Sequence, residues 1–258
     1  MKAKKSLGQN FFVNQNLAKR IVSEVLSNSV DILIEIGPGQ GYFTKLFHEQ
    51  EKEILLIEKD DLLAIQLRES FPKANVLNID FLDWNFEELK SISKKKITFF
   101  GSLPYNVSKK IIEKIIHSEY FNSPCFFIIQ KEVAENYISK APQNNYLAAK
   151  SYLYADSKKI FDITPESFRP RPKVMSSLIS FSPKTDSFPI SKELSEKRRF
   201  DIFLQQSFKQ PRKKLLNNLK NYTFSSNEKE KIQKLIERRA QHTTLEEFIF
   251  LFSNIRLD

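Results

Sequence analysis

The tetrapeptide Ser102-Leu103-Pro104-Tyr105 combines groups that could hold a planar amine. It follows residues 97–100, an apolar run typical of a buried strand, and open α/β sheets bind ligands where parallel strands end. A serine hydroxyl and a proline-stiffened carbonyl could accept hydrogen bonds from the amine, while the tyrosine ring stacks on its face. This combination indicates methylation of an amino group on a nucleotide base. An ordinary strand-to-helix turn also favours serine and proline, so the tetrapeptide alone leaves both interpretations open.

Three alternating glycines, Gly37, Gly39 and Gly41, follow the expected strand 32–36 and precede an expected helix. Glycine allows the backbone to turn tightly and to approach a ligand closely. The chain has 5 glycines in all, so three in one turn favour a ligand site over a turn that serves packing alone. Their spacing differs from the G-x-G-x-x-G fingerprint of dinucleotide sites, and no Lys, Ser or Thr follows them as in a P-loop.

Two acidic residues end the next two expected strands. Glu58 ends the strand 54–58, where a carboxylate can accept hydrogen bonds from both ribose hydroxyls. Asp80 follows the strand 75–79 and precedes Phe81, an arrangement that suits the amino group and ring face of an adenine. Each acid alone is more often a surface or capping residue, and NAD-dependent enzymes also use a ribose acid. Together with the glycine turn, the pair indicates S-adenosylmethionine, whose cationic sulfonium needs no lysine or arginine beside it.

A parallel sheet would bring these residues together. The first half of the chain alternates apolar runs with segments of helical periodicity, which predicts parallel strands joined by helical crossovers. The expected strands are 32–36, 54–58, 75–79, 97–100 and 124–130, and the expected helices include 42–50, 60–71 and 108–118. Two further strands, 158–163 and 174–181, would complete a seven-stranded, mostly parallel sheet as antiparallel edge strands.

The C-terminal part of the chain is expected to form a separate domain without strands. Helical periodicity covers 196–208, 212–221, 227–239 and 245–255, and the proline-flanked segment 183–189 is the expected linker. We therefore expect one domain over 1–186 and a helical domain over 187–258. From residue 192 onward there are 15 Lys and Arg against 9 Asp and Glu, a net +6 of the formal +10. Concentrated positive charge favours a nucleic-acid partner, although the codons of an AT-rich genome would also raise the lysine content and with it the net charge.

Composition argues against several other classes. No run approaches the roughly 20 apolar residues of a membrane span, and the charged N-terminus lacks the apolar core of a secretion signal. The single cysteine, Cys125, lies in an apolar run, as expected of a core residue in a reducing compartment. The 3 histidines are scattered and no second cysteine accompanies them. We expect a cytoplasmic protein without a metal site.

The complete set of motifs resembles the KsgA-type rRNA adenine N6,N6-dimethyltransferases, with the Erm-type rRNA methyltransferases as close relatives. The matching segments are Lys5–Phe11, Glu35–Gly41, Gly101–Ser108, Gln130–Val133, Phe168–Ser176 and Gln210–Lys214. The start Gly8-Gln9-Asn10-Phe11, and Arg239-Ala240 followed by Leu245–Phe248, favour the KsgA branch over the Erm branch.

The resemblance implies an α/β, Rossmann-like S-adenosylmethionine-dependent methyltransferase domain, followed by a small helical domain that helps to hold RNA. It implies that the N-terminal segment covers the cofactor. The candidate cofactor contacts are Asn10, Phe12, Gly37, Gly39, Glu58, Asp80 and Ser102. The expected substrate is a pair of adjacent adenosines in a hairpin loop near the 3′ end of small-subunit rRNA, each dimethylated within a pre-30S ribosomal particle. We expect a monomer.

The candidate catalytic residues hold the target adenine. Ser102 Oγ and the Leu103 carbonyl would accept its N–H groups, and Pro104 would stiffen the turn. Tyr105 would stack on one face, and Phe168 is the candidate for the other, although core packing explains a phenylalanine equally well in a chain with 23 of them. The family has asparagine where this chain has Ser102, whose side chain is shorter and offers one hydroxyl, so this difference bears on the methylation rate.

Basic residues are the candidate phosphate contacts, giving affinity and salt dependence rather than base specificity. They are Arg169, Arg171, Lys173, Arg198, Arg199, Arg212, Lys213 and Lys214. Three alternatives stay open: an Erm-like enzyme of large-subunit rRNA, a ribosome-assembly factor whose catalysis has weakened, and, on fold alone, an NAD-dependent enzyme.

Overall fold

The computed structural model describes residues 10–256 except 51, 93, 185–193 and 225–227. The first part of the matching segment Lys5–Phe11, most of the expected linker and the expected domain boundary lie outside the described residues. The strands are β1 (Phe11–Phe12), β2 (Ile32–Ile36), β3 (Glu53–Ile57), β4 (Asn75–Leu77), β5 (Ile97–Ser102), β6 (Cys125–Gln130), β7 (Ala155–Ile163), β8 (Phe168–Arg169) and β9 (Ser176–Pro183). The α-helices are α1 (Gln15–Leu26), α2 (Tyr42–His48), α3 (Asp61–Ser70), α4 (Ser108–Ile116), α5 (Lys131–Ile138), α6 (Tyr146–Ser151), α7 (Leu194–Ser207), α8 (Leu215–Asn218), α9 (Lys229–Ile236) and α10 (Leu245–Ser253).

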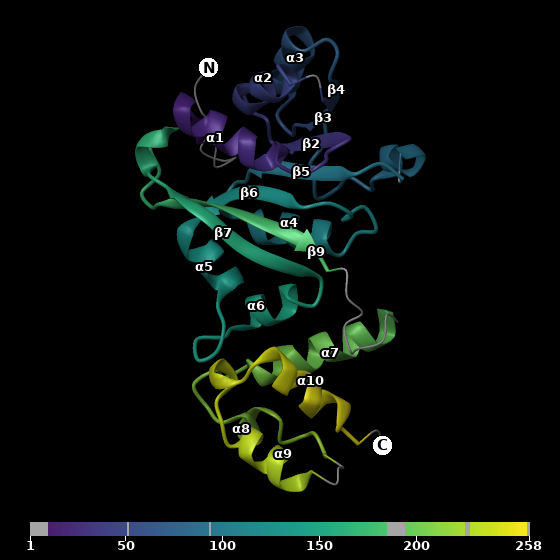
Figure 1. Cartoon of the computed structure of the whole chain (residues 1–258), viewed down its shortest axis with the longest axis vertical. Helices are drawn as coiled ribbons and strands as arrows, with labels where there is room; N and C mark the ends of the chain where they lie inside the picture. Colours follow the sequence, from purple (N-terminus) through teal and green to yellow (C-terminus); the bar gives the residue numbers. More distant parts are fainter. Residues whose placement is uncertain (1–9, 51, 93, 185–193, 225–227, 257–258) are drawn as a thin grey trace. The chain divides into compact units, whose positions relative to one another are not determined.

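The predicted seven-stranded sheet is confirmed. Its strand order is β4-β3-β2-β5-β6-β9-β7 (Figure 1). The strands from β4 to β6 run parallel, and β9 pairs antiparallel with β6. In the register of the central strands, Glu35 lies opposite Leu56 on one side and Phe100 on the other. The carboxyl ends of β2, β3 and β5 therefore meet at one edge, as the sequence required.

Both faces of the sheet are covered, and two adjacent residues of β5 show how. Phe100 points to the face covered by α1, α2 and α3, where its ring packs edge-on against Phe43 and Phe47 of α2. Phe99 points to the other face, where it contacts Phe81 and Phe86. Alternation along a strand sends neighbours to opposite faces, and apolar residues are needed at both positions when both faces are buried.

The expected elements are found with shifted ends, and one prediction needs correction. Only Leu215–Asn218 of the expected helix 212–221 is helical. The buried side-chain amide of Asn218 donates to the carbonyls of Ser207 (2.7 Å) and Gln210 (3.1 Å). These bonds hold the chain before α8 in a turn, and asparagine competes with helical hydrogen bonding in this way.

The chain divides into two compact units. The first holds the described residues of Met1–Ala134 together with Asp156–Pro183, and the second holds Glu135–Ala155 and the described residues of Lys184–Asp258. The segment 135–155 joins the second unit through specific bonds: Tyr146 donates to Asp201 of α7 (2.7 Å), and Asn144 donates to the carbonyl of Thr243 (3.0 Å). These contacts span long stretches of sequence, so the expected division at residue 186 assigned this segment differently.

The three glycines of the turn after β2, Gly37, Gly39 and Gly41, all have positive φ angles. Gly41, at the start of α2, has φ 77° and Gly37 has φ 63°. A Cβ added to Gly41 would lie 2.6 Å from a ring carbon of Phe71, whereas a Cβ added to Gly37 would meet nothing within 4 Å. Both positions carry the backbone penalty for an L side chain, and Gly41 also carries a steric one.

We predict that Gly41→Ala lowers the free energy of unfolding by roughly 2–4 kcal/mol, combining the left-handed backbone penalty with the clash against Phe71. Gly37→Ala is the matched control, with an expected loss of about 1–2 kcal/mol from the backbone alone. Urea denaturation of the two variants beside the parent protein measures both values. Equal losses in the two variants would show that Phe71 moves aside freely.

Candidate active site

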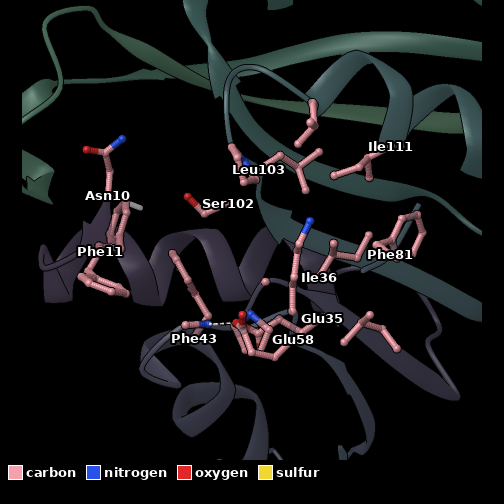
Figure 2. Close-up of a pocket in the computed structure, with 18 of the residues that line it drawn as sticks. Asn10, Phe11, Glu35, Ile36, Phe43, Glu58, Phe81, Ser102, Leu103 and Ile111 are labelled. Carbon is pink, nitrogen blue, oxygen red and sulfur yellow. Dashed lines mark hydrogen bonds between the residues drawn. The ribbon is translucent and has the colours of Figure 1, made fainter. Parts of the chain in front are cut away.

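A cavity of about 240 Å³ opens at the carboxyl ends of β2, β3 and β5, within the first unit. Figure 2 shows Asn10 and Phe11 at one side of it, with Ser102 near Leu103 and, below them in the view, Glu35 near Glu58. Every residue predicted to contact the cofactor or the target amine lines this cavity: Asn10, Phe12, Gly37, Gly39, Glu58, Asp80, Ser102, Leu103, Pro104, Tyr105 and Phe168.

The Glu58 carboxylate ties the end of β3 to the glycine turn after β2. The residue is 6% exposed, and its two oxygens accept the N–H groups of Gly39 (3.0 Å) and Asp60 (2.9 Å). Burial raises the pKa of Glu58, and the two backbone donors work against that rise by stabilising the charged form. Each oxygen keeps acceptor capacity beyond these bonds, which is what a pair of ribose hydroxyls would use.

Asp80 is held by a lysine that the sequence analysis did not single out. Lys59 Nζ lies 2.6 Å from Asp80 Oδ2, and the N–H of Leu82 donates to Oδ1 at 2.9 Å. Burial acts to raise the pKa of Asp80, but the bonds from Lys59 and Leu82 outweigh it and lower the pKa. Asp80 is therefore charged at neutral pH. Lys59 directly follows Glu58 at the end of β3, and Asp80 follows the neighbouring strand β4. The parallel pairing of these two strands could therefore have predicted that Lys59 lies close to Asp80.

Glu35 at the end of β2 is buried beneath the glycine turn at 2% exposure, and Thr44 of α2 donates to its carboxyl at 2.7 Å. Burial raises the pKa of Glu35 to about 8, against the lowering effect of Thr44. At neutral pH the carboxyl is mostly protonated, so it adds little negative charge beside Glu58. Glu35 begins the matching segment Glu35–Gly41, but its position in the sequence gave it no role.

The tetrapeptide is fixed by contacts to the neighbouring strands. The N–H of Leu103 donates to the carbonyl of Ile128 in β6 (3.0 Å), which sets the peptide after Ser102. The hydroxyl of Tyr105 lies 2.8 Å from Ser176 Oγ at the start of β9. Burial raises the pKa of Tyr105, so it stays a neutral phenol. Within the described chain, no group hydrogen-bonds Ser102 Oγ, which leaves that oxygen for a ligand.

Phe168 is both a core residue and part of the cavity wall. It is 2% exposed and belongs to the core beside α1, yet its ring also lines the cavity. Strand β8 pairs with β1, which places Phe168 opposite Phe12, and their rings meet edge-on at 5.2 Å. This pairing brings the N-terminal segment and the loop after residue 163 to the same wall.

None of the predicted phosphate contacts lines the cavity. All eight are exposed, with Arg169, Arg171 and Lys173 in the first unit and the others in the second. Some are engaged within the protein: Arg171 pairs with Glu166, and Lys214 with Glu237 at 2.5 Å. RNA contacts by these two side chains would have to compete with the ion pairs.

The charges of the cavity suit a cationic ligand. Among the described residues that line it, the carboxyl groups are Glu35, Glu58 and Asp80, and the one cation, Lys59, is bound to Asp80. A pyrophosphate would meet no uncommitted positive side chain here, whereas a sulfonium would meet none that repels it. The residues present therefore fit S-adenosylmethionine better than a dinucleotide.

Other kinds of site are not found in the part of the chain that the structure describes. No group of three or more histidine, cysteine or acidic side chains there could hold a metal ion. No helix within the described ranges is long and apolar enough to cross a membrane.

Known proteins similar to this chain are rRNA methyltransferases by name, as the cavity residues suggest. The model of the family described as ribosomal RNA adenine dimethylase matches residues 1–256. Ribosomal RNA small subunit methyltransferase A of Pelagibacter ubique is 38% identical over 233 residues, which cover 88% of this chain and 86% of that protein. The protein of the same name from Malacoplasma penetrans is 33% identical over 240 residues, covering 92% and 84%.

Two solved structures share the fold. A 23S rRNA methyltransferase, ErmE, superposes with a TM-score of 0.75 at 18% identity, covering 95% of this chain and 99% of that one. A dimethyladenosine transferase from Plasmodium falciparum gives 0.74 at 21% identity, covering 96% and 100%. These likenesses confirm the predicted Rossmann-like methyltransferase fold. The chain belongs to the ribosomal RNA adenine dimethylase family, whose members transfer methyl groups from S-adenosylmethionine.

Proposed function

We propose that this chain dimethylates two adjacent adenosines in a hairpin loop near the 3′ end of small-subunit rRNA, within a pre-30S ribosomal particle. The observation that carries the proposal is the meeting of the target motif, Ser102–Tyr105, with Glu58 and Asp80 on one cavity. The relatives named above are small-subunit enzymes by name, at over 30% identity. The likeness to a large-subunit enzyme is one of fold alone, so it does not favour the Erm-like alternative.

The residues of the cavity fall into two groups, one that would bind the cofactor and one that would hold the target adenine. On the cofactor side, Glu58 would bind the ribose, Asp80 and Phe81 the adenine, and Asn10 and Phe12 would cover the ligand. S-adenosylmethionine supplies an electrophilic methyl group when bound. The glycine turn would let the backbone lie close to it. All of these groups come from one chain, which supports a monomer as the active form.

On the target side, the chain would orient a poor nucleophile. The amine of adenine is unreactive because its lone pair is delocalised into the ring. Acceptors at Ser102 Oγ and the Leu103 carbonyl would hold its N–H groups and stabilise the positive charge that develops on nitrogen. Tyr105 and Phe168 would hold the ring, and orientation of this kind contributes roughly 7–11 kcal/mol. Adenines in a loop leave their stack more easily than paired ones.

A role in assembly with weakened catalysis has one observation in its favour, the serine at position 102. Every other residue predicted to contact the cofactor or the target amine lies on the cavity. A protein that only bound RNA would not need Glu58 and Asp80 to meet the target motif on one cavity. The catalytic function is therefore the better supported of the two.

We predict N6,N6-dimethyladenosine at two adjacent positions when the purified protein and S-adenosylmethionine act on small-subunit particles that lack the modification. Nuclease digestion followed by mass spectrometry identifies the product and its position. Large-subunit RNA serves as the control and is expected to stay unmodified. Methylation confined to large-subunit RNA, or no dimethyladenosine in either RNA, would contradict the proposal.

We predict that Ser102→Asn raises the single-turnover rate roughly three- to tenfold, because the longer amide would add about 1 kcal/mol of hydrogen bonding to the amine. Ser102→Ala is expected to lower the rate about tenfold or more, since it removes an acceptor. Because Ser102 is also a candidate cofactor contact, the Kd of each variant for S-adenosylhomocysteine is measured beside the rate, and the rates are compared at saturating cofactor. A Ser102→Asn rate at or below that of the parent would show that serine is fully accommodated.

A further inference from the structure

Lys114 of α4 binds backbone carbonyls of the turn that follows Asp80. Its ammonium donates to the backbone carbonyls of Phe81 (3.0 Å), Leu82 (2.7 Å) and Trp84. A lysine has three N–H donors, so these three acceptors use its full capacity. All three belong to the turn that follows Asp80.

The surroundings of Lys114 fix it further. The ammonium lies 5.6 Å from the ring centre of Phe81 and 5.2 Å from that of Phe86. Burial lowers the pKa of Lys114, while the carboxylates of Asp83 and Asp80 act to raise it. An ammonium bound to three carbonyls and two aromatic faces holds one position, unlike a solvated surface lysine.

The turn that Lys114 holds forms one wall of the cavity. The carbonyl of Asp80 accepts the N–H groups of Asp83 (2.9 Å) and Trp84 (3.1 Å), so the turn is built on the residue proposed to bind adenine. Phe81 lines the cavity, as does Ile111 on the helix that carries Lys114 (Figure 2). Helix α4 itself begins three residues after Tyr105.

We infer that Lys114 is a positioning residue, which locks the adenine wall formed by Asp80 and Phe81 to the helix that follows the target motif. The inference rests on the proposed function, because it takes this wall to be the adenine site. Lys114 touches neither the cofactor nor the substrate in this account. It acts by holding the turn in the shape that receives adenine before the ligand arrives, which lowers the cost of binding.

Lys114→Met tests the inference, because methionine keeps the apolar stem and removes the charge and all three donors. Lys110→Met is the matched control, since Lys110 is exposed on the same helix one turn earlier. Calorimetric titration with S-adenosylhomocysteine is expected to show Kd raised at least tenfold in Lys114→Met and unchanged in Lys110→Met. The loss should be equally large for adenosine, which shares only the adenine nucleoside with that ligand.

Trp84 gives an independent readout, because it is the one tryptophan of the chain and lies 2% exposed in the same turn. Its emission is expected to shift to longer wavelength in Lys114→Met and to return when the ligand is added. Unchanged Kd values in Lys114→Met would overturn the inference, as would a loss for S-adenosylhomocysteine much larger than for adenosine.

Two further results separate the possible failures. If the parent protein binds no S-adenosylhomocysteine, the proposed function fails, while the Trp84 shift still reports whether Lys114 holds the turn. If Lys114→Met does not fold, Lys114→Arg decides, because the guanidinium keeps the charge but its planar fork of donors does not converge on three carbonyls as an ammonium does. An Arg variant with shifted Trp84 emission and parental affinity would contradict the inference.

Discussion

The carboxylate of Glu58 is the interaction on which the rest of the site depends. It accepts one N–H from the glycine turn after β2 and one from the start of α3, so a single buried group joins two crossover connections. Neighbouring backbone bonds reinforce the junction, since Gly37 donates to the carbonyl of Ile57 (2.9 Å) and Glu58 donates to that of Leu77 (3.0 Å). A buried carboxylate is costly unless it is hydrogen-bonded, which means that this arrangement favours one geometry of the strand ends.

The electrostatics of the cavity follow from how its acids are paired. Glu58 is satisfied by backbone dipoles, Glu35 is mostly neutral at physiological pH, and Asp80 is bound to Lys59. The result is a mildly negative site in which Lys59, the one cation among the described lining residues, is already engaged. Lys114 is also paired within the protein, because its ammonium binds the backbone carbonyls of the turn that follows Asp80. Such a site suits a sulfonium and an uncharged amine, which are the two reactants of the proposed reaction.

The sequence predicted the sheet and the residues on the cavity because both follow from local pattern. Apolar runs followed by Gly37, Glu58, Asp80 and Ser102 place those residues at strand ends, and parallel pairing brings strand ends together. Contacts between distant segments had no such signal. Neither the bond between Tyr105 and Ser176 nor the three carbonyls bound by Lys114 can be read from spacing. Helices α1, α5 and α6 were not among the helices named from the sequence. The contacts that place 135–155 in the second unit join residues far apart in the sequence.

The central claim is that Glu58 both shapes the glycine turn and binds the cofactor, and calorimetric titration of Glu58→Gln with S-adenosylhomocysteine tests it most directly. Glutamine keeps the size of the side chain but loses the charge and one of its two acceptor oxygens. Hydrogen bonds to a charged group are worth about 1.5–3 kcal/mol, so we expect Kd to rise roughly 10- to 100-fold. The loss should shrink for an analogue without the ribose 2′-hydroxyl. Binding of S-adenosylhomocysteine by Glu58→Gln as tight as that of the parent protein would contradict the account.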